Sequence, residues 1–199
     1  MALKGRPAVF LDKDGTLVDN LPYNTNPAHI ALCRGAGEAL HALAQQGFAL
    51  IVVSNQQGIA RGWLADHDLS RARERIAILL AAYDVRLDGF YWCPHWPWSC
   101  KGRLGFACTC RKPAPGMLLR AAAEHALDLS SSWMVGDILD DIEAGRRAGC
   151  RTVLIDNGNE TEWRCSPLRH PHRLAPDLMT AARLIADHGQ LLSQPYATP

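Results

Sequence analysis

Two carboxylates that follow the first apolar run of the chain are spaced for joint chemistry. The run Ala8–Asp12 is expected to form a buried strand that ends in an acid, and the chain continues as Lys-Asp-Gly-Thr. Side chains two apart in an extended strand point to the same side, so Asp12 and Asp14 should face together while Lys13 points away. Because adjacent carboxylates repel, the pair needs a bound cation or a shared proton, unless both are ordinary solvated acids of a loop.

Further polar residues stand where later apolar runs end or helical patterns begin. Ser54 follows one apolar run, Lys112 opens a helical stretch, and Asp137 follows another run, with Asp141 four residues on. If a helix begins there, Asp137 and Asp141 share one of its faces. Simpler roles are open to each: Ser54 could cap a strand, Lys112 could be a surface cation, and Asp141 could be an acid in the first turn of a helix.

Four of the seven cysteines fall between residues 93 and 110. Three thiols and one imidazole are the ligands of a closed, structural zinc site, and this spacing supplies them from Cys93, His95, Cys108 and Cys110. Cys100 lies inside the same loop and could be a spare ligand. The alternative is a chance group of free thiols. An odd number of cysteines makes a complete disulfide framework the weaker explanation.

The elements that must position these residues alternate between short apolar runs and amphipathic patterns. Strands are expected at 8–12, 48–54, 89–93, 133–135 and 152–155, and helices at 37–46, 67–83, 115–127, 139–148 and 177–188, the second capped by Asp66. This alternation predicts an α/β fold with a doubly wound, Rossmann-like parallel sheet and helices on both faces. We expect one domain over residues 1–199, with a zinc-stabilised loop insertion at 94–114 and an irregular, solvated or flexible connection at 156–176.

Composition excludes several other classes of protein. The 199 residues are 48% hydrophobic and carry a net charge of +1, which is not the composition of a disordered chain or of a general nucleic-acid binder. Apolar runs such as Phe48–Val53 are far shorter than the roughly 20 residues of a membrane span. The first residues do not resemble an export signal, so we expect a cytoplasmic protein, acting as a monomer without nucleic-acid or membrane partners.

Taken in order, these residues resemble the four motifs of the haloacid-dehalogenase-like (HAD-like) phosphatases, over about residues 8–155. The resemblance implies that Asp12 is the nucleophile that forms an aspartyl-phosphate and that Asp14 is the general acid and base. It further implies that Ser54 and Lys112 hold the phosphoryl oxygens. Mg²⁺ would be held by the Asp12 side chain, the backbone carbonyl of Asp14 and Asp137. Asp141 would support the metal from outside its ligand shell.

The cysteine loop is similar to that of two groups in this superfamily, the heptose 1,7-bisphosphate phosphatases and the histidinol-phosphate phosphatases. The twelve residues between His95 and Cys108 favour the heptose group. That resemblance implies substrate recognition by Arg111, with further contacts from Asn20, Tyr23, Asn55, Gln56 and Gln57. Lys101 or Arg103 could join Arg111 at a second phosphate, and Trp96 and Trp98 could cover the sugar or pack around the metal. Ile138 stands where the heptose group often has a lysine.

The function that these residues favour is Mg²⁺-dependent removal of one phosphate from a small phosphorylated sugar. By resemblance the sugar is D-glycero-D-manno-heptose 1,7-bisphosphate and the product is heptose 1-phosphate. The alternatives are histidinol-phosphate hydrolysis, a nucleic-acid 3′-phosphatase, which the small net charge disfavours, and a non-catalytic, zinc-stabilised binding module. A protein of that last kind would be expected to have lost part of the acid and lysine set, all of which is present.

Overall fold

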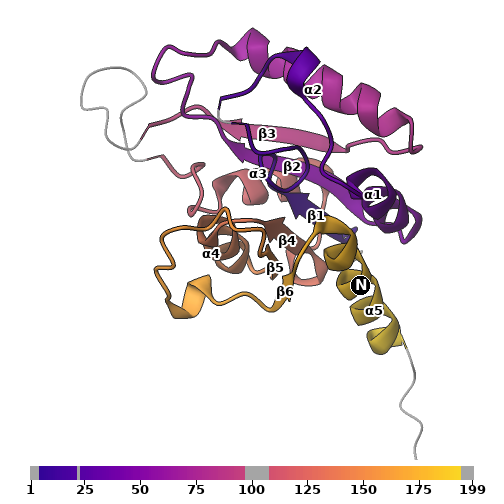
Figure 1. Ribbon diagram of the computed structural model, residues 1–199. Helices are drawn as coiled ribbons and strands as arrows, with labels where there is room; N and C mark the ends of the chain where they lie inside the picture. Colours follow the sequence, from indigo (N-terminus) through magenta and orange to yellow (C-terminus); the bar gives the residue numbers. More distant parts are fainter. Residues whose placement is uncertain (1–4, 22, 97–107, 194–199) are drawn as a thin grey trace, which may run out of the picture.

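The computed structural model describes residues 5–21, 23–96 and 108–193, and its centre is a parallel sheet (Figure 1). The strands lie in the order β3-β2-β1-β4-β5-β6, and all neighbours are parallel. Their bounds are β1 Ala8–Leu11, β2 Ala49–Asn55, β3 Gly89–Cys93, β4 Trp133–Gly136, β5 Arg151–Ile155 and β6 Arg173–Ala175. The predicted doubly wound fold is confirmed.

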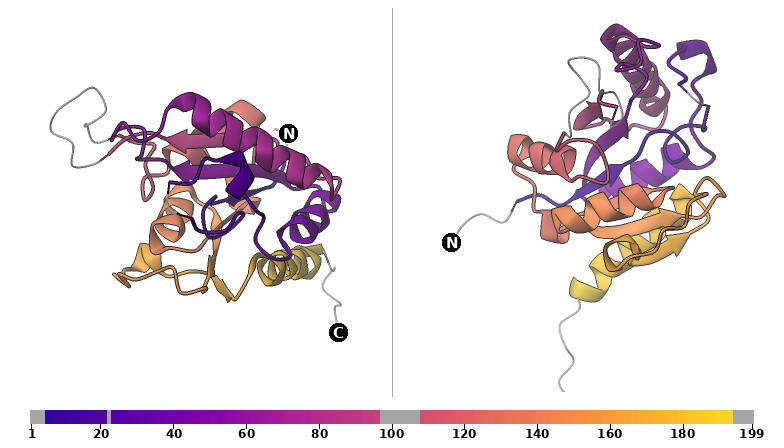
Figure 2. Two further views of the ribbon diagram at one scale, coloured as in Figure 1. Left: turned by 45° about the horizontal axis from the view of Figure 1, so that its top comes forward. Right: turned by 90° about the vertical axis from the view of Figure 1, so that its left-hand side faces the viewer.

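Helices cover both faces of this sheet (Figure 2). One face packs against α1 (Ala36–Gln45), α2 (Asp66–Ala81) and α5 (Leu178–Ser193). The other packs against α3 (Gly116–His125) and α4 (Leu139–Ala148). Short 3-10 helices lie at Pro27–His29, Leu129–Ser131 and Pro167–Arg169. Among the described helices, none is long and apolar enough to cross a membrane.

The apolar residues of β1 are divided between the two layers. Val9 and Leu11 belong to the core under α1, α2 and α5, whereas Ala8 and Phe10 belong to the core under α3 and α4. Successive strand residues point to opposite faces, so a strand covered on both sides must be apolar throughout. The continuous apolar runs of the sequence therefore reflect two-sided burial.

From β1 the sheet continues through β2 and β3 on one side and through β4, β5 and β6 on the other. The strand order therefore reverses next to β1, between β1 and β4. In doubly wound sheets the ligand site lies beyond the carboxyl ends of the strands at this reversal. Asp12 follows β1 and its backbone N–H donates to the carbonyl of Val135 at 2.9 Å. Asp137 follows β4. The topology thus brings the carboxylates of two distant motifs to one point.

Two local predictions were wrong. Lys13 does not point away from the two acids: its ammonium pairs with the Asp14 carboxylate, and the residue is 2% exposed. The strand ends at Leu11, so the alternation of side chains no longer applies at residue 13. Asp66 is the first residue of α2 rather than its cap, and the carboxylate of Asp68 accepts the N–H of Ala65 at 2.9 Å instead.

The segment 156–176 is mostly exposed, as expected of a solvated connection, but it is not irregular throughout. It contains β6 and a 3-10 helix, and Arg169 pairs with Asp140 and with Glu143, the latter at 2.7 Å. Two of the three residues of β6 are exposed, so the strand has almost no apolar pattern by which the sequence could reveal it. Its position follows from pairing with β5, where Leu154 lies opposite Leu174.

Phe10 is fully buried in β1, beneath α3 and α4. We expect Phe10→Ala to lower the free energy of unfolding by about 3–5 kcal/mol, because the truncation leaves a cavity at the centre of the sheet. Leu119 on α3 is 47% exposed, and Leu119→Ala should cost less than about 1 kcal/mol. Urea denaturation of both variants measures the difference, and equal losses would contradict this account of the core.

Candidate active site

A buried lysine lies at the centre of the carboxylate cluster. The Nζ atom of Lys112 is 2.5 Å from Oδ1 of Asp12 and 2.6 Å from Oδ1 of Asp141, and it donates to the carbonyl of Val53 at 2.9 Å. Lys112 is 1% exposed. Burial alone lowers the pKa of this amine, but the two carboxylates outweigh burial and raise the pKa above its ordinary value. The lysine is therefore a permanent cation beside Asp12.

Asn55 fixes the backbone of that lysine. Its amide nitrogen donates to the carbonyl of Lys112 and its amide oxygen accepts the Lys112 N–H, both at 3.0 Å. The sequence predicted Asn55 as a substrate contact. Asn55 does line the cavity next to Asp14, but both ends of its amide are already hydrogen-bonded to the backbone.

Three carboxylates converge beside the lysine. Oxygens of Asp12, Asp137 and Asp141 all lie within 4.8 Å of one another, and all three residues are buried. Burial, followed by the charge of Asp12, raises the pKa of Asp137 to about 7, and burial raises that of Asp141 to about 8. A divalent cation with oxygen ligands would relieve this repulsion, so the donor set fits Mg²⁺. Asp141 contacts the lysine, which agrees with a supporting role.

Asp14 is linked to Ser54 through a buried glutamine. The side-chain nitrogen of Gln56 donates to Oδ2 of Asp14 at 3.0 Å and to Oγ of Ser54 at 2.8 Å. Burial raises the pKa of Asp14, against the lowering effect of the neighbouring Lys13 ammonium. A carboxyl group with a raised pKa holds a proton more readily, as a general acid must. Gln56 was predicted as a substrate contact; in the structure its side chain is hydrogen-bonded to two other members of the site.

Three further residues support the site, and sequence analysis did not predict any of them. Asn159 donates to Oδ2 of Asp137 at 2.6 Å, Asn157 donates to the carbonyl of Gly15 at 2.8 Å, and Glu160 accepts the N–H of Leu139 at 2.6 Å. All three lie in the turn after β5, where polar residues are ordinary loop residues by composition. Their partners belong to two distant motifs, and only the fold brings them together.

Position 15 requires a glycine because Asp137 and Asn159 lie very close to it. Its φ is +84°, and an added Cβ would lie 2.0 Å from Oδ2 of Asp137 and 2.4 Å from Nδ2 of Asn159. A side chain at this position would therefore collide with the carboxylate cluster as well as strain the backbone. The first motif thus needs a glycine here because Asp137, from the fourth motif, lies against it.

A cavity of about 210 Å³ opens beside Asp14. It is lined in part by Asn20, Tyr23 and Gln57, three of the predicted substrate contacts. Gln57 donates to the Tyr23 hydroxyl at 3.2 Å and accepts from a guanidinium nitrogen of Arg111 at 2.9 Å. Predicted contacts from two separate segments therefore line one opening, and Gln57 connects them to Arg111 in a third.

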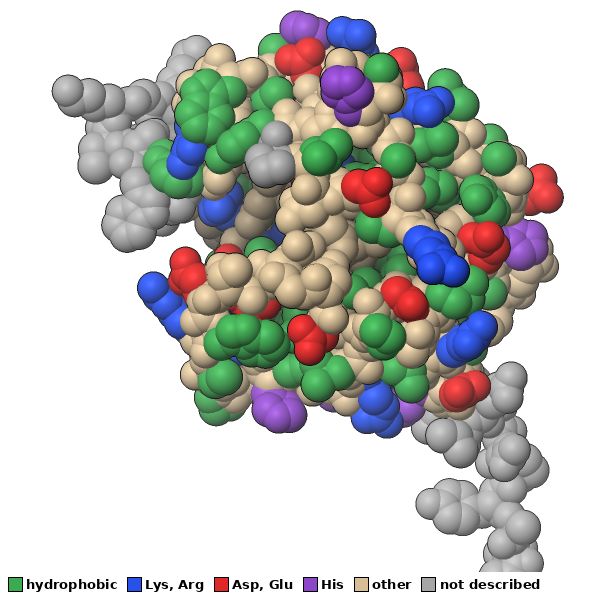
Figure 3. Space-filling model, viewed as in Figure 1, with side chains coloured by type: hydrophobic (Ala, Val, Ile, Leu, Met, Phe, Trp, Pro, Cys, Tyr) green, Lys and Arg blue, Asp and Glu red, His purple; other side chains and the backbone are tan. Residues whose placement is uncertain are grey.

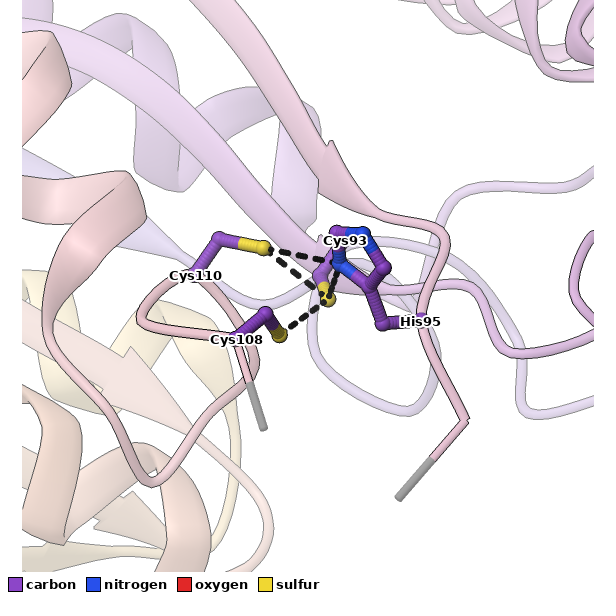
Figure 4. Close-up of side chains that lie close together, drawn as sticks. All are labelled: Cys93, His95, Cys108 and Cys110. Carbon is purple, nitrogen blue, oxygen red and sulfur yellow. Dashed lines mark hydrogen bonds between the residues drawn. The ribbon is translucent and has the colours of Figure 1, made fainter. Parts of the chain in front are cut away.

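Cys93, His95, Cys108 and Cys110 form one cluster (Figure 4). Cys93 Sγ lies 3.5 Å from Cys108 Sγ and 3.2 Å from Cys110 Sγ, and His95 Nδ1 lies 3.2 Å from Cys110 Sγ. Zn–S bonds of about 2.3 Å in a tetrahedron would separate two sulfurs by about 3.7 Å. The donor types and their separations fit zinc, and the six described cysteines form no disulfide.

The cluster is connected to Arg111. The Arg111 backbone N–H donates to Cys108 Sγ at 3.3 Å, and its guanidinium donates to the carbonyl of His95 at 3.4 Å. Burial raises the pKa of the Cys108 thiol, but hydrogen bonds to the sulfur, first that of Arg111, outweigh it and leave the pKa below its ordinary value. A lowered pKa favours the thiolate, which is the form that binds metal.

One predicted residue of this loop contacts another part of the chain, and several others lie outside the described residues. Trp96 stacks on Arg61, whose guanidinium carbon is 3.7 Å from the indole centroid. Trp98, Cys100, Lys101 and Arg103 lie outside the described residues, as does most of the expected loop insertion.

The relatives found by comparison with known proteins agree with one another. A family model described as HAD-hydrolase-like matches residues 109–181. The D-glycero-beta-D-manno-heptose-1,7-bisphosphate 7-phosphatase of Escherichia coli strain K12 is 41% identical over 156 residues, which is 78% of this chain and 82% of that protein. The protein of the same name from Yersinia pestis is 40% identical over 153 residues, covering 76% of this chain and 81% of its own length.

Solved structures agree with this result. A HAD-like phosphatase from Mesorhizobium loti has a TM-score of 0.77 and 33% identity, covering 92% of this chain and 88% of its own. The D,D-heptose 1,7-bisphosphate phosphatase from B. bronchiseptica, complexed with magnesium and phosphate, has a TM-score of 0.74 and 26% identity, covering 92% of this chain and 99% of its own.

If the cysteine cluster holds zinc, the purified protein should contain about one equivalent, and Cys108→Ala should lose it. We expect that variant to melt on the order of 5–10 °C lower, because the metal joins β3 to the chain before α3. Cys165→Ala is the matched control, since Cys165 is a free, exposed cysteine. Elemental analysis with thermal unfolding checks both. Wild-type protein with far less than one equivalent of zinc would contradict the assignment.

Proposed function

Because the chain belongs to the HAD-like hydrolases, and among them to the family of D-glycero-beta-D-manno-heptose-1,7-bisphosphate 7-phosphatases, we propose that it hydrolyses the 7-phosphate of that sugar. The products would be heptose 1-phosphate and inorganic phosphate. The observation that carries this proposal is the buried assembly of Asp12, Lys112, Asp137 and Asp141 at the reversal of strand order. The identity of the relatives supports the substrate.

In the proposed reaction, a carboxylate oxygen of Asp12 attacks phosphorus. The new O–P bond forms as the bond between phosphorus and the sugar oxygen breaks, leaving an aspartyl-phosphate. Lys112 is placed to offset the negative charge of Asp12 and of the incoming phosphate, since its ammonium already contacts Asp12. Ser54, which is 1% exposed, would hold an equatorial phosphoryl oxygen. Asp12 follows β1, Ser54 lies near the end of β2 and Lys112 precedes α3, so the three groups come from separate segments of the chain.

Proton transfer is proposed for Asp14. It would protonate the departing sugar oxygen and then take a proton from the water that cleaves the aspartyl-phosphate. Its raised pKa suits the first of these steps, and the hydrogen bond from Gln56 orients it for both. Mg²⁺ would be held by Asp12, Asp137 and the backbone carbonyl of Asp14. When bound, it would screen the phosphate from the anionic nucleophile.

Asp12→Asn removes the nucleophile while keeping the shape of the side chain. We expect phosphate release to fall by about a thousandfold or more, with an unchanged circular dichroism spectrum. Asp187→Asn, which alters an exposed acid of α5, should keep wild-type activity. Phosphate release on heptose 1,7-bisphosphate with Mg²⁺ provides the measurement. Near wild-type turnover by Asp12→Asn would refute the assigned nucleophile.

A comparison of substrates tests the proposed sugar. Heptose 1,7-bisphosphate, in each anomer, and histidinol phosphate would be assayed under the same conditions, and the value of kcat/KM should be highest for a heptose bisphosphate. Faster hydrolysis of histidinol phosphate would favour the other phosphatase group that the cysteine loop resembles. No phosphate release from any of these compounds would favour a binding protein instead.

A further inference from the structure

A second, larger cavity of about 780 Å³ opens beside the candidate active site. Residues around the cysteine cluster, the helix α4 and the segment 156–176 form its walls. Lys112 and Arg111 both line it, so the cavity begins next to the lysine that contacts Asp12. Figure 3 shows Lys and Arg side chains on both sides of a hollow at the left of the molecule.

The lining of this cavity is strongly basic. Five cationic side chains line it against two acidic ones: Arg111, Lys112, Arg147, Arg164 and Arg169 against Asp140 and Glu162. Such an excess of cations in a concave site attracts anions. The question is which of these cations are free to bind one.

Three of the five cations are held by buried or nearly buried carboxylates. Lys112 pairs with two carboxylates of the catalytic cluster. Arg169 pairs with Asp140 and Glu143, and Arg147 pairs with the same Glu143 at 2.6 Å. The side chain of Glu143 is only 12% exposed. The pairs of Arg169 join α4 to the segment 156–176, and Glu143 offsets the charge of both arginines.

The other two arginines have weaker partners. Arg111 donates to neutral oxygens, the amide of Gln57 and the carbonyl of His95. Arg164 lies 3.2 Å from the carboxylate of Glu162, in a pair whose side chains are 79% and 67% exposed. Ion pairs this exposed contribute little to stability, so a phosphate can replace Glu162 at the Arg164 guanidinium.

We propose that Arg164, together with Arg111, binds the phosphate of the substrate that is not hydrolysed. This inference rests on the proposed function, because only a bisphosphate brings a second phosphate when its first is at Asp12. The two guanidiniums come from separate segments of the chain and line one cavity. Each can offer two parallel N–H donors to a phosphate. Arg164 thereby selects bisphosphates over monophosphates of the same sugar.

The test compares heptose 1,7-bisphosphate with heptose 7-phosphate, which lacks the second phosphate. We expect Arg164→Gln to lower kcat/KM for the bisphosphate by about tenfold, mainly through KM, and to lower that for the monophosphate by less than about twofold. Arg164→Lys should recover part of the loss, because it keeps the charge but not the forked donors. Arg71→Gln, on the exposed side of α2, is the control for removing a surface arginine.

The outcomes separate this inference from the proposed function. Wild-type protein that releases phosphate from neither sugar would overturn the proposed function and this inference with it. If the wild type hydrolyses both, equal losses on the two sugars or no loss on either would overturn the role of Arg164 alone. A selective loss of the bisphosphate, repaired in part by lysine, supports it.

Discussion

The contact of one buried ammonium with two carboxylates governs the rest of the site. Lys112 lies between Asp12 and Asp141 where water cannot screen any of the three charges. Removing one partner of such a group leaves an uncompensated buried charge, which is strongly destabilising. The lysine therefore favours the ionised form of the neighbouring acids, against the effect of their burial. Asn55 and the carbonyl of Val53 hold it, so β2 contributes to the site through fixed hydrogen bonds.

A continuous series of contacts joins the cysteine cluster to the opening of the active site. Cys108 accepts the backbone N–H of Arg111, whose guanidinium donates to Gln57, and Gln57 donates to the hydroxyl of Tyr23. A metal at the cluster would therefore order the loop and also limit the positions available to Arg111. In our proposal such a metal would bear on substrate recognition, although the cysteine cluster lies apart from the carboxylates around Lys112.

The segment after β5 closes the opposite side of the site. Its first turn contacts Gly15 and Asp137 through Asn157 and Asn159, and its later part is joined to α4 by Arg169. The first contacts hold Asp137 of the carboxylate cluster and the backbone at Gly15, and the second bring further arginines to the large cavity. One polar stretch thus serves the reacting centre and, in our proposal, the recognition of a second phosphate.

The sequence by itself determined the doubly wound fold, the acids and lysine that gather beyond the strand ends and the four members of the cysteine cluster. These were readable because each is a local pattern: an apolar run that ends in an acid, or cysteines at ligand spacing. Only the tertiary structure decided the burial of Lys13, the tethering role of Asn55, the strand β6 and the contacts of Asn159 and Arg169. Each of these depends on partners that are distant in sequence or, for Lys13, on where a strand stops. Polar residues in a turn have the same local pattern whether they face water or a buried carboxylate, so only the packing of separate segments distinguishes the two.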